Sequence, residues 1–537
     1  MHHRQLAITI PRYGTSWPPR SFTTLFDVKR IANLTPCVYG ASSQHHPLPQ
    51  YFFFTSISWE ACSVSRKLLT TVGAAKFPSI FIWTRALRTA GLDVLQPGPT
   101  IYKSTGELVW SDPSLGSCND LNFQTFEGEQ YLTVWVGTGG GASGLQTGSG
   151  FALILNSKYE VIRNISAVNP EGTDLHEFRI PQPAARTALL TAFNPVQLDL
   201  TSVGGLAKGW YLNSIIQEVD IDSGRVLFNW TSADHIALDE SFNNLTTSGS
   251  GTSEGNPWDA VHINSIDKNH EGNYLISSRH CKTIYKIDKN GTIIWRLGGS
   301  RSDFTAVSND TEFNWQHHVR WRNDETQISV FDDGAAVLHQ TSIVVDEPVA
   351  TGKLLNVDQE AMTVSLAKRY FPSPNTGFSL AEGSTELYGD FVVVGYGSNP
   401  WITVHDTATQ GVVFSAVIGP NNSTLWVGGI SNYRAFQTST HAFTGHPTQP
   451  PSVAVVAGDV YVSWNGATNV ASYTLFTGSS PEKVTTRVSN VRNSGFETKI
   501  SAGGASTFIL VEALAADGKI LGRSVVHRAS DGSIASR

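Results

Sequence analysis

The chain has 537 residues, of which 40% are hydrophobic and only 15% are charged, well below the roughly 25% of an average soluble domain. Its formal net charge of -7 offers no basic surface for nucleic acid or for an anionic membrane, so neither is an expected partner. No window approaches about 18 consecutive apolar residues, which predicts that no segment spans a membrane. Because Gly (48), Phe (26) and Trp (14) are plentiful, the composition favours an all-β protein with glycine turns.

Residues 1–95 form a region for which we predict no fold. Its apolar runs, YFFFTSISWEACSVS and KFPSIFIWTRAL, lack alternating partners. The region is either a loosely packed extension or translated sequence that is absent from the mature protein.

From about Gly98 the chain changes to short β-branched and aromatic runs that are separated by turn residues. One pattern recurs every 50 to 70 residues, with an apolar run, a turn of Gly, Asp, Asn or Ser, and a second apolar run. Its six copies span 101–110, 151–165, 215–230, 284–297, 354–371 and 402–419. With further strand-like runs between the copies, this pattern is typical of four-stranded propeller blades, so we predict a six-bladed β-propeller over 96–446. A large β-sandwich or several unrelated hairpins are the alternatives.

A proline-rich segment, HPTQPPS (446–452), marks a second boundary. The runs after it alternate apolar and polar residues at short spacing, and Trp464 and Tyr473 lie within them. The pattern predicts a small fibronectin- or immunoglobulin-like β-sandwich over 447–537.

Histidine and arginine are concentrated between Pro257 and Trp321. The five histidines of this stretch are His262, His270, His280, His317 and His318, and its arginines include Arg279. Earlier in the chain, DLHEF places His176 at the same point of the repeated pattern. A neutral imidazole is a competent nucleophile near pH 7.

Strand alternation predicts which of these side chains share a face. In HINS it places His262 and Asn264 on the same face. In SSRH it separates Arg279 from His280, so only one of the two is expected beside His262, and the same rule separates His317 from His318. A histidine, an asparagine and an arginine that converge on a propeller channel would bind an oxyanion, although any one strand histidine is more often a structural group.

Other chemical signals are weaker. GGGASG (139–144) is followed by a strand-like run and not by a helix, which argues against dinucleotide binding. No phosphate-binding P-loop and no G-x-S-x-G motif is present, and the carboxylates of FDDG (331–334) are expected in a surface turn. The four cysteines form no C-x-x-C pair, so we predict no metal site and no cofactor, and leave one or two disulfides open.

The signals for localisation point in two directions. The N-terminus lacks the apolar core of a signal peptide. Asn-x-Ser/Thr sequons occur at Asn33, Asn164, Asn229, Asn244, Asn290, Asn309, Asn421 and Asn422. These sequons favour a secreted glycoprotein in the extracellular space or the secretory pathway.

The motifs DLHEF, WDAVHINSID, LISSRH, IIWRLGG and WQHHVRW resemble, in their order, the arylsulfate sulfotransferase family in its fungal-type branch. Further motifs extend the resemblance over about Pro97 to Arg523. The resemblance implies a six-bladed propeller that moves a sulfuryl group from an aryl sulfate to a phenol without a nucleotide donor, through a sulfohistidine. Relatives often carry an acidic residue where His318 stands.

Carried over by motif, the resemblance assigns His317 as the nucleophile. The residues it implies as sulfate-binding and proton-transferring groups are His262, Asn264, Arg279 and His176. Of the other histidines, we expect His270 in an exposed turn, and His280 and His318 facing away from the site.

Two functions of other classes remain open. One is a secreted, non-catalytic propeller that binds carbohydrate or protein, and the other is a propeller hydrolase or lyase that uses the same histidines on another ester. The sequence makes no prediction of the oligomeric state.

Overall fold

The structure is a computed structural model. It describes residues 7–8, 22–23, 79–86, 98–139, 147–182, 186–338, 342–373, 376–417, 431–439, 443–504 and 507–535. Most of the region 1–95, most of the GGGASG segment, and the sequons at Asn33, Asn421 and Asn422 lie outside these residues. Cys37 and Cys62 also lie outside them, whereas Cys118 and Cys281 are buried free thiols.

The chain divides into two compact units. The larger comprises Lys67–Thr105 and Ser111–Phe443, and the smaller comprises Met1–Arg66, Gly106–Trp110 and Thr444–Arg537. Among the described residues, the α-helices are only α2 (Ser232–His235) and α3 (Leu245–Ser248), with 3₁₀ turns η3 (Pro113–Leu115), η4 (Thr201–Val203), η5 (Leu238–Glu240) and η6 (Gly299–Arg301). The prediction of an all-β protein is confirmed. In the described part of the chain, no helix has the length and apolar character needed to cross a membrane.

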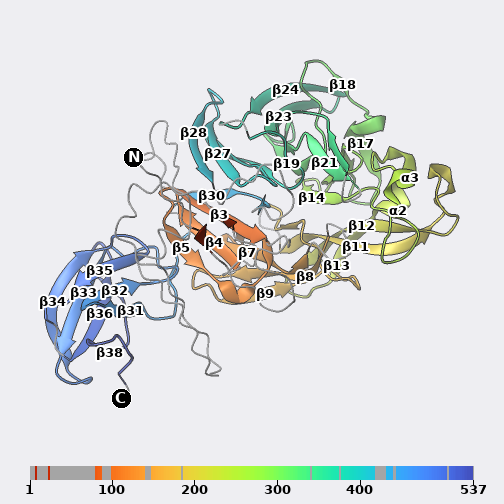
Figure 1. Ribbon diagram of the computed structural model, residues 1–537. Helices are drawn as coiled ribbons and strands as arrows, with labels where there is room; N and C mark the ends of the chain where they lie inside the picture. The colour runs from red at the N-terminus through yellow and green to blue at the C-terminus, as the bar shows by residue number, and fades with distance from the viewer. Residues whose placement is uncertain are drawn as a thin grey trace. The chain divides into compact units, whose positions relative to one another are not determined.

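Five antiparallel sheets follow one another along residues 118–417 of the larger unit (Figure 1). Sheet 1 contains β6 (Cys118–Phe126), β7 (Glu129–Gly139), β8 (Gly148–Leu155) and β9 (Val161–Ile165). Sheet 2 contains β10 (Phe178–Arg179), β11 (Thr187–Leu198), β12 (Gly209–Asp220) and β13 (Val226–Thr231). Sheet 3 contains β14 (Ile263–Lys268), β15 (Tyr274–Ser278), β16 (Thr283–Ile287) and β17 (Ile293–Gly298).

Sheets 4 and 5 continue the series. Sheet 4 contains β19 (His317–Arg322), β20 (Gln327–Asp332), β23 (Thr351–Asp358) and β24 (Thr363–Tyr370), and β18 (Thr305–Ala306) adds to β24 in parallel. A separate hairpin of β21 (Ala335–Leu338) and β22 (Ser342–Val345) is inserted after β20. Sheet 5 contains β25 (Ser384–Tyr388), β26 (Phe391–Gly395), β27 (Trp401–Asp406) and β28 (Val412–Val417).

A sixth sheet joins strands from the two ends of the larger unit. β3 (Ser79–Ala86) pairs with β4 (Gly98–Lys103) on one side and with β29 (Ser431–Asn432) and β30 (Phe436–Ser439) on the other. Figure 1 shows the orange β3 beside the blue β30. Segments about 350 residues apart in sequence therefore share one set of backbone hydrogen bonds.

Five of the six repeated patterns coincide with strand pairs of this unit. They match β8 with β9, β12 with β13, β16 with β17, β23 with β24 and β27 with β28. The first pattern, 101–110, contains the end of β4 and most of β5 (Leu108–Ser111). The turn between β16 and β17 shows why these residues reverse the chain. Asp288 Oδ1 accepts the backbone N–H groups of Asn290 and Thr292, and Gly291 takes the positive φ of 99° that the turn requires.

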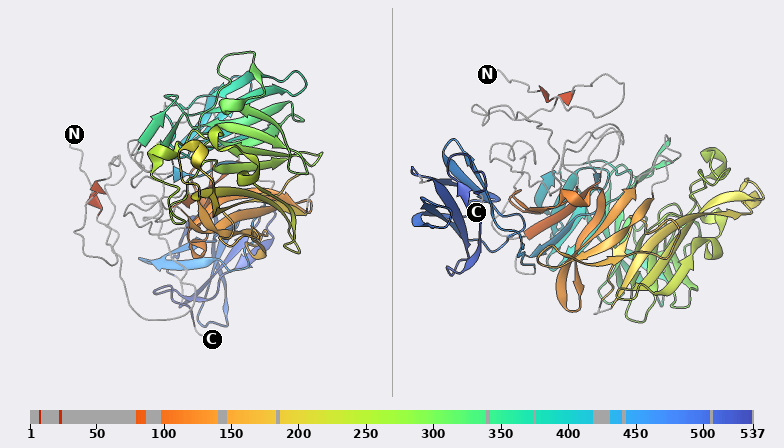
Figure 2. Two further views of the ribbon diagram at one scale, coloured as in Figure 1. Left: turned by 90° about the vertical axis from the view of Figure 1, so that its right-hand side faces the viewer. Right: turned by 90° about the horizontal axis from the view of Figure 1, so that it is seen from below.

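Successive sheets of the larger unit lie side by side (Figure 2). Clusters of buried apolar side chains fill the space between them. Ile154 of sheet 1 and Leu190 of sheet 2 share one cluster, and Ile216 of sheet 2 shares another with Ile276 of sheet 3. Further clusters join sheet 3 to sheet 4 and sheet 4 to sheet 5. The core is thus a series of apolar layers between neighbouring sheets. The polar groups of the candidate site lie at or near the first strands of successive sheets, outside these layers.

The smaller unit contains two antiparallel sheets and a two-stranded ribbon of β1 (Ala7–Ile8) and β2 (Phe22–Thr23). One sheet contains β31 (Ser452–Val456), β32 (Asp459–Ser463) and β35 (Glu497–Ser501). The other contains β34 (Val484–Arg492), β33 (Ser472–Gly478), β36 (Phe508–Leu514), β37 (Ile520–Arg523) and β38 (His527–Arg528). Val462 of the first sheet and Leu475 and Val511 of the second belong to one buried cluster.

Candidate active site

His317 is the first residue of β19 in sheet 4, and its side chain is buried. Its Nδ1 lies 2.7 Å from Oδ2 of Asp333, the residue after β20, and its Nε2 accepts the backbone N–H of Glu382 at 3.2 Å. Because Nε2 accepts a hydrogen bond, it carries the lone pair and Nδ1 carries the proton. This tautomer is the one that a nucleophilic Nε2 needs.

The electrostatic environment keeps His317 neutral. Burial lowers its pKa well below 6.5, and the charges of Arg279 and His176 lower it further. Burial raises the pKa of Asp333, but the tautomer of His317 still requires Asp333 Oδ2 to accept the Nδ1 proton. The imidazole therefore presents its Nε2 lone pair at neutral pH.

Gln316 fixes the backbone on which His317 stands. Its Nε2 donates to Ser277 Oγ and to the carbonyl oxygen of Ser278 at 3.1 and 2.9 Å, which ties it to β15. Its own carbonyl oxygen accepts Nδ2 of Asn264 at 2.7 Å. Asn264 thus links sheet 3 to the backbone next to His317.

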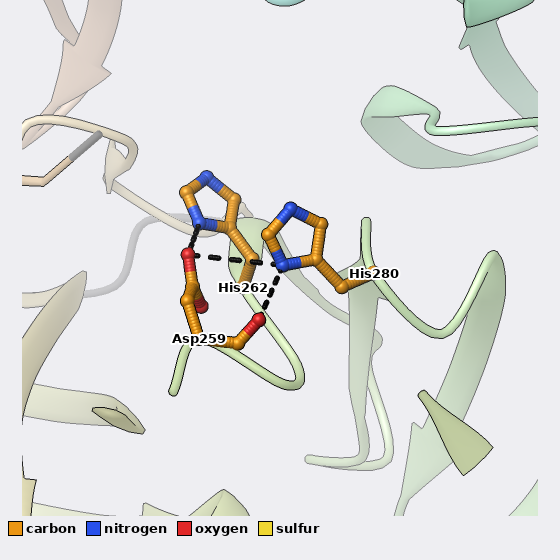
Figure 3. A group of neighbouring side chains, drawn as sticks. All are labelled: Asp259, His262 and His280. Carbon is orange, nitrogen blue, oxygen red and sulfur yellow. Dashed lines mark hydrogen bonds and ion pairs between the residues drawn. The ribbon is translucent and has the colours of Figure 1, made fainter. Parts of the chain in front are cut away.

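His176 and His262 face each other through their Nε2 atoms, which lie 3.2 Å apart. Nδ1 of His176 lies 2.6 Å from Asp174 Oδ2. Nδ1 of His262 lies 2.7 Å from Asp259 Oδ2, a contact that Figure 3 shows. Two lone pairs at this distance would repel each other, so one proton lies between the two Nε2 atoms. The pair is a proton donor held in place by a carboxylate at each end.

The two carboxylates differ in their environments. Burial alone would raise the pKa of Asp174, but the adjacent His176 and a hydrogen bond from the Gly148 N–H lower it below its ordinary value. Burial raises the pKa of Asp259, although His280 and Arg279 oppose that effect. Of the two carboxylates, Asp174 therefore ionises more readily than Asp259.

His280 lies beside His262, which corrects the prediction that it faces away. Its ring centroid is 4.8 Å from that of His262, its Nδ1 donates to the carbonyl oxygen of Asp259 at 2.7 Å, and its Nε2 accepts Nη1 of Arg279 at 2.9 Å. Burial lowers its pKa to about 3, so it is neutral. The alternation rule was wrong here because β15 ends at Ser278, and Arg279 and His280 lie in the turn after it.

Arg279 lies at the centre of these groups. Its Nη2 donates to the carbonyl oxygen of Leu380 at 2.7 Å, two residues before the N–H that contacts His317. Its guanidinium lies 5.7 Å from the ring centroid of Trp315, and the side chain is buried. A buried guanidinium near the neutral imidazoles of His280 and His317 is a favourable environment for an anion.

The remaining histidines follow their predictions. His270 is exposed, with its Nδ1 3.3 Å from Glu325. His318 is buried 3.7 Å from Glu386, away from Asp333 and the partners of His317. Both β14 and β19 contain a register shift at the site, and His262 and His318 have φ values of 56° and 54°. These bulges, and not simple alternation, direct the side chains.

Sequence reasoning missed the three carboxylates that hold the histidines. Asp174 and Asp259 stand two and three residues before their histidines, a local spacing that could have revealed them. FDDG is not a surface turn, because Asp332 and Asp333 are fully buried. Asp332 pairs with the buried Lys353 at 2.7 Å, and Asp333 pairs with His317.

Asp259, His262 and His280 also form the one group among the described residues whose ligand atoms could surround a metal ion, within 4.8 Å of one another. Hydrogen bonds already account for this arrangement, because both Nδ1 atoms contact Asp259. A metal at this group would have to displace the Nδ1 proton that His280 donates to the Asp259 carbonyl oxygen. The residues fit a hydrogen-bonded network better than a metal centre.

Comparison with known proteins gives the class. The arylsulfotransferase (ASST) family model matches residues 122–419, more than half of the chain, so the chain belongs to this family. The match contains all five residues singled out from the sequence, and membership implies aryl sulfates and phenols as substrates. No curated protein matches the chain.

Solved structures resemble the chain only distantly. The β-propeller domain of Myceliophteria thermophila Cps50 (Swd1) is 10% identical, with 56% of this chain and 87% of that chain covered and a TM-score of 0.32. A protein from Lactobacillus plantarum is 9% identical, with 67% and 99% covered and a TM-score of 0.32. Kuenenia stuttgartiensis hydrazine synthase is 11% identical, with 59% and 62% covered and a TM-score of 0.23. Similarity this low leaves the fold to be judged from the chain's own sheets.

Proposed function

We propose that the protein transfers a sulfuryl group from an aryl sulfate to a phenol, without a nucleotide, through a sulfohistidine at His317. One observation carries the proposal: His317 is buried and neutral, its Nε2 lone pair accepts the Glu382 N–H, and the charge of Arg279 and the His176–His262 pair act on it electrostatically. Sulfuryl transfer, like phosphoryl transfer, depends mainly on positioning and on stabilising charge on oxygen.

In the first half of the cycle, His317 Nε2 attacks sulfur. The bond from sulfur to the aryl oxygen breaks, its electron pair goes to that oxygen, and the leaving phenolate takes the proton held between His176 and His262. The sulfated imidazole then carries positive charge at Nδ1, which Asp333 offsets at 2.7 Å. Arg279 and the second Nδ2 hydrogen of Asn264 would hold the sulfuryl oxygens.

In the second half, an acceptor phenol returns its proton to the histidine pair. Its oxygen attacks sulfur, the S–N bond breaks, and the electron pair returns to Nε2. Each half regenerates the groups that the other half uses, so the kinetics would be ping-pong.

We also propose that the larger unit is a closed six-bladed propeller and the smaller unit, over about 447–537, a β-sandwich. Six sheets in series, with strands from both ends of the unit paired in the sixth, support the closure. A buried cluster shared by two sheets supports the sandwich. The fungal-type branch rests on the sequence motifs alone.

Secretion is part of the same proposal. The asparagines of the five described sequons are exposed at the surface, as a glycan would require. They are Asn164, Asn229, Asn244, Asn290 and Asn309.

A binding module without catalysis is not favoured. Three histidines are buried with a carboxylate at each Nδ1. Desolvating such ionisable groups is unfavourable, and a binding function would not require it, whereas catalysis would. A hydrolase would use the same first half but pass the sulfuryl group to water.

The test is to mix the purified protein with 4-nitrophenyl sulfate, with and without a phenol, and to digest it for mass spectrometry. We expect one added SO₃ on the peptide containing His317, and nitrophenol release that increases with acceptor concentration. His317→Ala should show neither, while His270→Ala, at the exposed histidine, should behave as wild type. Nitrophenol release that is independent of the acceptor concentration would indicate a hydrolase. The absence of nitrophenol release would refute the proposal.

A further inference from the structure

A dipeptide outside the family match touches three parts of the candidate site. Tyr433 and Arg434 lie between β29 and β30 in the sixth sheet, beyond residue 419, where the match ends. Both side chains are almost fully buried, with 1% and 2% of their surface exposed. Neither residue stood out in the sequence.

Tyr433 contacts the backbones of two site segments. Its hydroxyl donates to the carbonyl oxygen of His176 at 2.6 Å, and its own carbonyl oxygen accepts the N–H of Gly383 at 2.9 Å. The residue before Gly383 is Glu382, whose N–H donates to Nε2 of His317. One residue thus bonds to the histidine of sheet 2 and to the loop that orients the nucleophile.

Arg434 adds a third segment and binds two carboxylates. Its Nη2 donates to the carbonyl oxygen of Asn264 at 2.9 Å. Its Nη1 donates to Asp120 Oδ1 and to Glu177 Oε1, both at 2.9 Å. Glu177 follows His176 directly and also accepts Nη2 of Arg320 at 2.8 Å.

These contacts join residues that lie in or next to five of the six sheets. Asp120 is in sheet 1, Glu177 precedes sheet 2, Asn264 is in sheet 3, Arg320 is in sheet 4 and Arg434 lies between two strands of the sixth sheet. Buried ion pairs are a poor source of stability because desolvation offsets their attraction, but they fix geometry strongly. We therefore attribute to these ion pairs a role in fixing the positions of the residues that they join.

We propose that Tyr433 and Arg434 are positioning residues that set the backbones of His176, Asn264 and Glu382 relative to one another. The inference rests on the proposed sulfuryl transfer. It means that the site is complete only when the segment after residue 430 has paired into the sixth sheet. Because the reacting atoms come from different sheets, small shifts of these backbones would separate them.

The test compares two single-atom deletions, Tyr433→Phe and Tyr396→Phe. Tyr396 is a matched control because it is fully buried and its hydroxyl makes one hydrogen bond, to Thr403 at 3.0 Å, outside the site. Both variants lose one buried hydroxyl, so we expect similar decreases in Tm. Only Tyr433→Phe should lose kcat/KM for the aryl sulfate, by about tenfold or more.

A second readout separates positioning from stability. In Tyr433→Phe, the pH dependence of kcat should shift, because His176 shares its proton with His262, whereas Tyr396→Phe should keep the wild-type profile. If the two variants keep equal activity and the wild-type profile, the inference is wrong while the proposed function stands. If the wild type itself transfers no sulfuryl group, the proposed function is what fails.

Discussion

Nε2 of His176 lies 3.2 Å from Nε2 of His262, although 86 residues separate the two in the chain. A carboxylate lies at Nδ1 of each ring, so the two imidazoles share a proton between carboxylates from the segments that precede sheets 2 and 3. This relationship, with the neutral His317 nearby, leads to the following predictions.

Replacing Asp333 with Asn should slow transfer without preventing binding. The amide oxygen can still accept the Nδ1 proton of His317, but it offers no negative charge to the sulfated imidazole. We expect kcat to fall about 10²- to 10⁴-fold, as for loss of a carboxylate behind other catalytic histidines. Stopped-flow measurement of nitrophenol release would give the rate of transfer in the variant and in the wild type. Asp222→Asn, at a surface ion pair with Arg163, is the control and should keep full activity.

The acid limb of kcat/KM should lie well below pH 6.5. Burial lowers the pKa of His317 well below that value, so the nucleophile remains unprotonated as the pH falls through 6. The measurement is a pH profile of kcat/KM for the aryl sulfate in buffers of constant ionic strength. An acid limb centred near 6.5 would mean that His317 is solvated and would contradict the described geometry.

Arg279→Lys should weaken the site despite keeping the charge. The guanidinium spans His280 Nε2 and the carbonyl oxygen of Leu380, and a single ammonium cannot make both contacts. We expect kcat/KM for the aryl sulfate to fall by about 10²-fold, because both anion binding and the loop before Glu382 are disturbed. Arg163→Lys, at the exposed ion pair with Asp222, provides the comparison and should change activity less than threefold, roughly within the range of surface effects. Equal losses in the two variants would argue against a specific role for Arg279.

Stability should decrease as the pH falls below about 6.5, in part through a histidine outside the site. His405 in β27 is buried, and burial lowers its pKa to about 4. The unfolded chain binds a proton near its ordinary value of about 6.5, so stability is present above that pH and is lost as the pH falls toward 4. The contribution is about 3 kcal/mol. His405→Gln should therefore flatten the decrease of Tm between pH 6.5 and 4, while activity at pH 7 is kept. A slope equal to that of wild type would show that His405 is protonated in the folded state.

Much of the fold could be predicted from local pattern. The repeated hairpins coincide with strand pairs because turn residues such as Asp288 and Gly291 and alternating apolar runs act over a few residues. The motifs also singled out His176, His262 and His317, which stay predictions as catalytic groups. Prediction was wrong where a strand ended or bulged, as at His280 and Asp333, because side-chain direction there depends on turns and tertiary packing.

The sequence by itself determined the all-β class, the family, and the positions of His176, His262, Asn264, Arg279 and His317. Only the tertiary structure decided what holds them, namely Asp174, Asp259 and Asp333 on the three Nδ1 atoms and Tyr433 with Arg434 on their backbones. The physical reason is the separation in sequence over which the interactions act. Strands and turns follow from interactions between close neighbours in sequence, whereas the arrangement of the site depends on groups as much as 314 residues apart that meet only in the tertiary structure.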